Sequence, residues 1–501
     1  MKKRIISSIS VLLLIAMALI PSVSAFTPYD GYTYDVWSTS VPSPVGYLPE
    51  GTVSGKDLGV GDLFNPSDMY DDKNAKEIYI LDAGNNRVIV IDYNFKLVRV
   101  LDKFTLKDGT PATFDTPEGL TVDKKGNIYI CDTKNKRILK FNKDQQEVMT
   151  VTLTRDKYEI LRENYVFYPQ KVVVGVNSEL YVVAEGTIEG MAKFDPEGNF
   201  KGFFGSPKIG LSAMVVLENF WRQFMTEAQI ENRVRLLSIE YSNVYMRQDG
   251  FMFACVKNTE DNQGQVVRLN FHGDNTLSAA NRALQSLKLP NLYGDYEFVD
   301  NATAKRVNIF VDICIDEEKQ YINILDREYK RVFQYDADGN LLFIYGANGD
   351  QLGAFDDPVA IDVINGKHIV LDMKKGTITI FGISEFGGKV HNAVDVFNSG
   401  DYEAALEPWN EVLRYNANYD FAHVGIGKVY YNLRNFAKAK EHFYLAEDRG
   451  NYGKAFREYR SEVIRDNFGL IALVIVLIPA AMFVVKKVKQ FRAGKKGKGE
   501  E

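Results

Sequence analysis

Three copies of the spacing Asp-x-x-x-x-Arg carry the residue types best suited to chemistry in this 501-residue chain. A carboxylate beside a guanidinium could serve general acid–base chemistry or bind an anion. A catalytic group, however, needs a special environment that a protein usually builds once. Each pair stands at the same offset between two apolar runs. This repetition predicts that each arginine stabilises a turn by donating hydrogen bonds to its aspartate or to carbonyl oxygens of a neighbouring copy of the repeat. The pairs are Asp82 with Arg87, Asp132 with Arg137, and Asp326 with Arg331.

The elements that carry these pairs belong to one unit that occurs six times. Each copy has four short runs of period-two or continuous apolar character, divided by turn residues such as Asp-Gly and Asn-Lys. This pattern is typical of antiparallel strands joined by tight turns. A four-stranded unit of about 40–50 residues cannot bury both of its faces alone, whereas a closed ring of six units can. The sequence therefore predicts a mainly β fold, a six-bladed β-propeller.

The second copy carries the most complete set of spaced motifs, namely Pro117, Gly119, Val122, Asp123, Gly126, Asn127, Tyr129, Asp132, Asn135 and Arg137. These motifs resemble the blades of the NHL-repeat family, and the resemblance covers roughly residues 60–385. The first copy keeps Pro66, Tyr79, Asp82, Asn86 and Arg87, and the fifth keeps Asp326 and Arg331. The sixth copy has Asp372 but Thr377 where arginine would stand, and the third and fourth copies are degenerate.

Two segments fall outside the six copies. The last copy supplies only three strands, so we expect residues 31–37, "GYTYDVW", to provide the fourth strand and tie the ends of the ring together. Residues 206–237 show helical periodicity, and Thr226 with Gln229 fit a capping box. This insertion either packs as a helix over the propeller rim or acts as a lid or partner-binding element. The propeller is predicted to span residues 26–388.

Both ends of the chain carry signals for membrane targeting. Residues 1–25 have a basic start, an apolar run and a small-residue end, which predicts a secretory signal peptide. Residues 467–486 contain an uncharged run long enough for a transmembrane helix. The basic tail, residues 487–501, is expected to stay in the cytoplasm. The sequence thus predicts a single-pass protein of the cell membrane whose N-terminal bulk is extracytoplasmic.

The predicted topology changes the meaning of the net charge, which is −6 over the whole chain. The signal peptide contributes +3 and the residues from Lys486 onward contribute +5, so the extracytoplasmic part carries −14. An acidic exterior argues against nucleic acid as a partner.

The chain has three cysteines, an odd number for an exported protein: Cys131, Cys255 and Cys314. Each lies inside an apolar run, so we expect buried small hydrophobes rather than a disulfide framework. An exported part of this size without such a framework indicates a bacterial envelope protein.

From about residue 389 to residue 466 the apolar period changes from 2 to 3.6, which predicts helices. Two stretches align at an offset of 34 residues, the period of the tetratricopeptide (TPR) repeat. They resemble that family at Tyr402, Ala405, Trp409, Gly427, Tyr430, Phe436, Ala439 and Phe443. The resemblance implies either a short groove for a peptide or helix, or a spacer that leads the chain to the membrane.

No sequence motif for a nucleophile elbow, a zinc protease or a phosphate-binding loop is present. Only His272 and His368 lie in the predicted propeller, too few for the three-histidine zinc site of some propeller lyases. Lactonases of related shape hold calcium near the propeller axis, and Asp123, Asp312 and Asp362 could supply oxygen ligands there. The alternative role for these aspartates is to cap turns of the repeat, and no cofactor is predicted.

The chain resembles membrane-anchored bacterial NHL/TPR proteins, which tend to accompany sugar ABC-transporter components. That resemblance implies a binding or scaffold protein, whose partner is a protein, a peptide or a glycan, with an accessory role in a transport or envelope complex. The alternative is a calcium-dependent, lactonase-like hydrolase with its site in the propeller channel.

Overall fold

The computed structural model describes residues 28–35, 39–162, 164–205, 240–257, 265–277, 293–295 and 308–496. The chain divides into two compact units, which are Met1–Tyr34 with Ser38–Gly388, and Asp35–Trp37 with Lys389–Glu501. The predicted signal peptide (1–25), the predicted insertion (206–237) and the end of the tail (497–501) lie outside the described residues.

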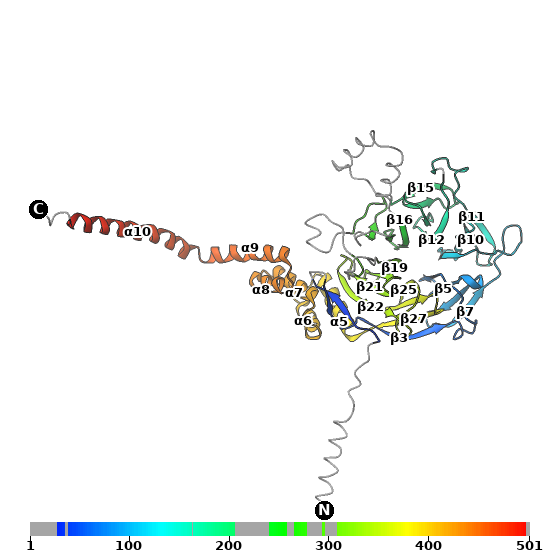
Figure 1. The fold of residues 1–501 in the computed structure, drawn as a ribbon, viewed down its shortest axis with the longest axis horizontal. Coiled ribbons are helices and arrows are strands. Elements are labelled where there is room, and N and C mark those ends of the chain that lie inside the picture. The colour runs from blue at the N-terminus through cyan, green and yellow to red at the C-terminus, as the bar shows by residue number, and fades with distance from the viewer. Residues whose placement is uncertain are drawn as a thin grey trace, which may run out of the picture. The chain divides into compact units, whose positions relative to one another are not determined.

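The first unit is a six-bladed β-propeller, and its blades follow one another around a ring (Figure 1). Within each blade the strands are antiparallel and paired in chain order, because tight turns connect successive strands. Blade 1 contains β4 (Asp68–Asp72), β5 (Glu77–Asp82), β6 (Arg87–Asp92) and β7 (Leu97–Leu101). Blade 2 contains β8 (Pro117–Val122), β9 (Ile128–Asp132), β10 (Arg137–Phe141) and β11 (Glu147–Val151). Blade 3 contains β12 (Tyr168–Val174), β13 (Leu180–Glu185), β14 (Met191–Phe194) and β15 (Phe200–Phe204).

The other three blades continue the ring. Blade 4 has three strands in the described part of the chain, β16 (Glu240–Met246), β17 (Met252–Lys257) and β18 (Val266–Leu269). Blade 5 contains β19 (Phe310–Asp316), β20 (Tyr321–Asp326), β21 (Arg331–Tyr335) and β22 (Leu341–Tyr345). Blade 6 contains β25 (Pro358–Ile364), β26 (Lys367–Asp372) and β27 (Thr377–Ile383). The first strands of neighbouring blades contact one another around the ring and form its inner wall.

The ring closes with an N-terminal strand, but not with the one expected. The fourth strand of blade 6 is β3 (Tyr47–Ser54), which pairs antiparallel with β27. The prediction of residues 31–37 was wrong: in the part of the chain that the structure describes, β1 (Tyr32–Tyr34) pairs with β2 (Ser40–Pro42) in a separate two-stranded sheet. β3 is an edge strand, which tolerates the proline and glycine that make it look like a turn in the sequence.

Two minor elements complete this unit. A short 3₁₀ helix, η1 (Ala83–Asn85), follows β5. The two-residue strands β23 (Ala347–Asn348) and β24 (Ala354–Phe355) pair in parallel between blades 5 and 6.

The hydrophobic core lies between adjacent blades. The strands of blades 2 and 3, for example, enclose one cluster of fifteen buried residues. Cys131, Cys255 and Cys314 are buried and free, as predicted. His368 is also buried and stacks on the ring of Tyr47, so it belongs to the core.

The second unit contains two helical hairpins followed by two further helices. The helices of the C-terminal region are α5 (Glu385–Asn398), α6 (Leu406–Tyr415), α7 (Asp420–Asn432), α8 (Phe436–Leu445) and α9 (Arg449–Asp466). Small residues allow close crossing: a Cβ on Gly427 would lie 2.6 Å from the ring of Phe443, and one on Gly425 would lie 2.5 Å from Trp409. Ala439 is fully buried beside Phe443.

The last helix, α10 (Phe468–Lys496), carries no charged residue from Phe468 to Val485 and contains Pro479. Its length and composition suit a membrane span, and none of the apolar stretch is buried within the protein. The structure thus supports a membrane anchor.

Candidate functional site

In blades 1 and 2 the repeated arginine contacts its own aspartate. Arg87 Nε donates to Asp82 at 2.7 Å, and Arg137 Nε donates to Asp132 at 2.8 Å. Both aspartates are fully buried, and each also accepts a backbone N–H from the loop that enters its blade. The arginines reach carbonyl oxygens of the same loops. The pairs therefore fasten the entering loop to the end of the second strand.

Blade 5 departs from this arrangement, and here the prediction was wrong. Arg331 pairs with Asp295 and with the phenol of Tyr32, rather than with Asp326. Tyr32 also donates to Asp295 at 2.8 Å, so the guanidinium is drawn towards the N-terminal hairpin. The contacts of Arg331 with Asp295 and Tyr32 therefore hold β1 against blade 5.

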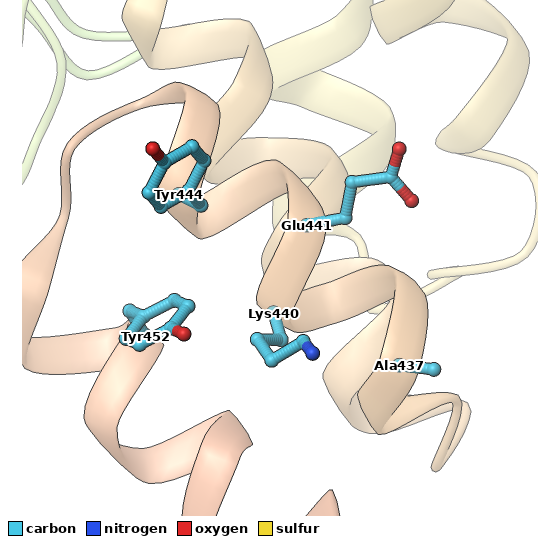
Figure 2. Close-up of a pocket in the computed structure, with 5 residues that line it drawn as sticks. All are labelled: Ala437, Lys440, Glu441, Tyr444 and Tyr452. Atoms are coloured by element: carbon cyan, nitrogen blue, oxygen red, sulfur yellow. The ribbon is translucent and has the colours of Figure 1, made fainter.

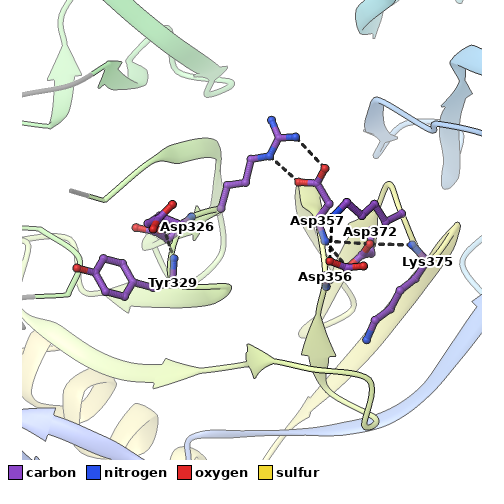
Figure 3. A network of polar contacts seen from close by, with 9 residues as sticks. Asp326, Tyr329, Asp356, Asp357, Asp372 and Lys375 are labelled. Atoms are coloured by element: carbon purple, nitrogen blue, oxygen red, sulfur yellow. Dashed lines mark hydrogen bonds and ion pairs between the residues drawn. The ribbon is translucent and has the colours of Figure 1, made fainter. Parts of the chain in front are cut away.

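Asp326 is consequently a buried carboxyl that lacks its arginine (Figure 3). Its Oδ1 accepts the backbone N–H groups of Glu328 at 2.7 Å and Tyr329 at 2.9 Å. Its Oδ2 is buried and has no hydrogen-bond partner among the described residues. Burial raises the pKa of Asp326 to about 7, and the backbone hydrogen bonds offset only part of that rise.

Blade 6 keeps the aspartate but replaces the arginine. Asp372 accepts backbone N–H groups of the entering loop, as its counterparts do (Figure 3). Lys375 Nζ donates to the carbonyl oxygens of Gly349 at 2.7 Å and Ala354 at 2.8 Å. Lys375 therefore holds the loop although Thr377 stands at the arginine position.

A buried ion pair joins the inner strands of two blades that are not neighbours in the ring. Lys171 Nζ, from the inner strand of blade 3, lies 2.6 Å from Asp68 Oδ1 in the inner strand of blade 1. Blade 2 has Gly119 between them, where a Cβ would lie 2.3 Å from the carbonyl oxygen of Gln170. Burial opposes the charge on Lys171, but Asp68 and Asp312 outweigh it and raise the pKa of Lys171 above its usual value. The ammonium of Lys171 therefore offsets part of the negative charge of the inner-strand carboxylates.

Inner-strand aspartates also join blades directly. Each accepts a backbone N–H from the inner strand of the next blade, so its carboxylate acts as an inter-blade clamp. The pairs are Asp68 with Leu120 at 2.7 Å, Asp312 with Ile361 at 2.7 Å, and Asp362 with Asp71 at 3.3 Å.

A second bridge spans the axis where the inner strands end. Lys73 follows the inner strand of blade 1, and its Nζ donates to the phenol of Tyr245 at 2.8 Å and to Glu317 at 3.1 Å. Tyr245 donates to the same carboxylate at 2.8 Å. Tyr245 belongs to blade 4, which stands opposite blade 1 in a ring of six. This end of the axis is therefore also crossed by side chains of the protein.

Beside this bridge, Asp71 accepts the phenol O–H of Tyr93 at 2.6 Å. Burial, and then the nearby carboxylate of Asp362, raise the pKa of Asp71 to about 7. The pKa of Asp362 is raised as well, chiefly by burial. The carboxylate of Asp362 therefore makes ionisation of Asp71 less favourable.

The three aspartates proposed as calcium ligands do not meet. Asp312 and Asp362 lie in inner strands, close to Lys171. Asp123 lies in the turn after β8, where it accepts from Asn127 at 2.9 Å and pairs with Lys140 at 3.4 Å. Within the described ranges, no group of three or more His, Cys, Asp or Glu side chains could hold a metal ion.

The helical unit has a shallow concavity with a volume of about 350 Å³ between α8 and α9 (Figure 2). Tyr444 is 71% exposed at its edge, and its ring centroid lies 6.2 Å from that of Tyr452. Tyr452 stacks nearly parallel with Phe456. Lys440 and Glu441 supply one charge of each sign beside these rings. The surface therefore offers aromatic faces together with hydrogen-bond donors and acceptors.

Sequence reasoning missed the groups that cross the axis. Lys171 and Asp68 are 103 residues apart, and Lys73 and Tyr245 are 172 residues apart. The sequence signal that could have indicated them is the lysine in the mostly apolar strand "YPQKVVV". A buried ammonium without a partner is strongly destabilising, so a lysine at such a position indicates a buried carboxylate elsewhere in the fold.

Comparison with known proteins agrees with this architecture. The family model described as "NHL repeat" matches residues 114–141, which cover most of blade 2. The mouse protein "NHL repeat-containing protein 3" is 28% identical over 26% of this chain and 47% of its own length, and the human protein is 27% identical over the same shares. The chain thus spans about half the length of these curated relatives. The structure is that of a six-bladed β-propeller, one blade of which matches the NHL repeat, with a C-terminal helical segment and one long apolar helix.

Solved propeller structures align with this chain at low sequence identity and low TM-score. Virginiamycin B lyase from Staphylococcus aureus aligns with 11% identity and a TM-score of 0.38, over 65% of this chain and 97% of the lyase. Aldose sugar dehydrogenase from Streptomyces coelicolor aligns with 9% identity and a TM-score of 0.40, over 68% and 99%.

Proposed function

We propose that this protein is a membrane-anchored binding or scaffold protein whose propeller and helical unit engage a partner outside the cytoplasm. The observation that carries this proposal is the filled axis. Lys171 and Lys73 occupy the space in which a propeller enzyme would hold a cation or a substrate. Such internally paired charges favour a structural role for the axis and leave recognition to the outer surfaces.

The helical hairpins are proposed to be TPR repeats. The 34-residue offset and the close crossing of Gly427 against Phe443 support this assignment. Ala405 and Ala439, at equivalent positions of the two hairpins, are both fully buried. The concavity beside Tyr444 and its aromatic neighbours would contact a protein, a peptide or a glycan.

The proposed orientation places the propeller and the helical unit outside a bacterial cell membrane, with the basic tail in the cytoplasm. An accessory role in a sugar ABC-transport or other envelope complex is consistent with that placement. Calcium-dependent hydrolysis at the axis is the competing proposal, and it would require Lys171 to leave Asp68 and Asp312.

Site-specific photo-cross-linking in the native membrane tests the binding proposal. A photoreactive side chain at Tyr444 is expected to give one defined cross-linked species. The control position is Tyr415, a 44% exposed tyrosine at the end of α6. Protease or glycosidase sensitivity of the product then identifies a protein or a glycan partner. The same pattern at both positions, or no product at Tyr444, would count against binding at this surface.

A further inference from the structure

Two histidines of the helical unit face each other through the same ring atom. His423 lies on α7 and His442 on α8, and their Nδ1 atoms are 3.2 Å apart. Both side chains are half-buried, so they remain reachable from solvent. The ring centroids are 5.4 Å apart and the rings are tilted by 37°. The two helices are thus joined at this point by two imidazoles rather than by apolar packing.

The second nitrogen of His423 determines where its lone pair is. Nε2 lies 3.2 Å from the carbonyl oxygen of Ala417. A carbonyl oxygen only accepts hydrogen bonds, so Nε2 carries the proton and Nδ1 presents its lone pair to His442. Metal-bound histidines commonly donate their other N–H to a backbone carbonyl in this way, which fixes both the tautomer and the ring orientation.

We propose that His423 and His442 form a two-histidine site for a transition-metal ion such as Zn²⁺, completed by water molecules. Two nitrogens bound to a tetrahedral zinc at about 2.0–2.1 Å lie about 3.3 Å apart. The observed Nδ1 separation is within about 0.1 Å of that spacing. A small ring rotation directs both lone pairs to one point, and the proton on Nδ1 of His442 moves to Nε2 or to solvent.

The surroundings tolerate a bound cation. Glu441 and Lys438 place opposite charges near His442, so their effects oppose each other. The ammonium of Lys438 lies over the ring of Tyr430, 5.0 Å from its centroid. Bound metal would join α7 to α8 in the second hairpin, a role separate from the partner surface between α8 and α9.

Titration of the full-length protein in detergent with Zn²⁺ tests this site. We expect one ion per chain by calorimetry and a higher midpoint of helical unfolding, followed by the far-ultraviolet circular dichroism of the helices. His423→Ala or His442→Ala is expected to weaken binding at least tenfold. His272→Ala is the matched control, because His272 is exposed in a propeller turn, and it should leave binding unchanged.

X-ray absorption at the zinc edge gives a readout that does not depend on any variant folding. Two nitrogen neighbours with imidazole scattering and additional oxygen neighbours are expected. The proposal is overturned if binding does not saturate, if it survives both histidine substitutions, or if the bound zinc has no imidazole neighbours.

Discussion

Replacing Asp326 by asparagine should stabilise the propeller at pH 8, whereas the same change at Asp132 should destabilise it. The two aspartates occupy the same position of the repeat and are both fully buried. Asp132 has its partner in Arg137. Asp326 has lost its arginine to Asp295, and its Oδ2 lacks a partner in the described part of the chain.

The magnitude follows from the pKa of Asp326, which burial raises from 3.8 to about 7. The carboxyl of Asp326 binds its proton more tightly in the folded than in the unfolded protein. Its contribution to the free energy of unfolding is therefore complete below pH 4 and is lost as the pH rises through 7. A shift of about three units corresponds to at most about 4 kcal/mol. Asparagine has no charge to bury, so Asp326→Asn removes this loss. Asp132→Asn instead breaks a charged hydrogen bond, which costs about 1.5–3 kcal/mol.

Urea unfolding of the full-length protein in detergent, followed by the far-ultraviolet circular dichroism of the strands, measures both effects at pH 5 and pH 8. Other buried carboxyls titrate in wild type and variant alike, so the difference between the two proteins isolates Asp326. The reasoning would be refuted if both substitutions destabilised the protein equally at pH 8 and if the stability difference between wild type and Asp326→Asn were the same at pH 5 and pH 8.

Three further predictions concern the axis, the helical unit and the anchor. Lys171→Met should lower the free energy of unfolding by about 3–5 kcal/mol, because it leaves buried carboxylates without a cation. Adding Asp68→Asn to this variant should restore part of the lost stability. If urea unfolding shows that the losses from the two substitutions simply add, the prediction is contradicted. Gly427→Val should lower the unfolding midpoint of the helical unit, because the new side chain would meet the ring of Phe443. Gly453→Ala is the control: the position has open space around it, so alanine should raise helix stability by about 0.5–1 kcal/mol. A chain without residues 468–501 should leave the membrane fraction, and retention there would argue against α10 as the anchor.

The repeat was predictable from the sequence because its signals are local. Strand runs and turns lie within a few residues of one another, and the Asp82–Arg87 contact spans only five positions. The closing strand was not predictable in the same way. Residues 31–37 have stronger β-propensity than β3, but edge position and pairing with β27 decide which segment closes the ring.

The contacts that fill the axis depend on blades far apart in the sequence. Nothing near Lys171 in the chain indicates that its ammonium pairs with Asp68, 103 residues away. Arg331 shows the same limit, since its local partner Asp326 was the expected one and the buried carboxylate of Asp295 replaced it. Local spacing determined the blades, whereas tertiary packing determined which charges meet.

Calcium titration of the purified full-length protein tests most directly the claim that the axis is filled by the protein's own lysines. Calorimetry would compare wild type with Asp312→Asn, after circular dichroism has established that both are folded. The account predicts no saturable heat in either protein, because Lys171 already neutralises the axial carboxylates. One tightly bound calcium ion per wild-type chain, absent from Asp312→Asn, would contradict it and favour a hydrolase site at the axis.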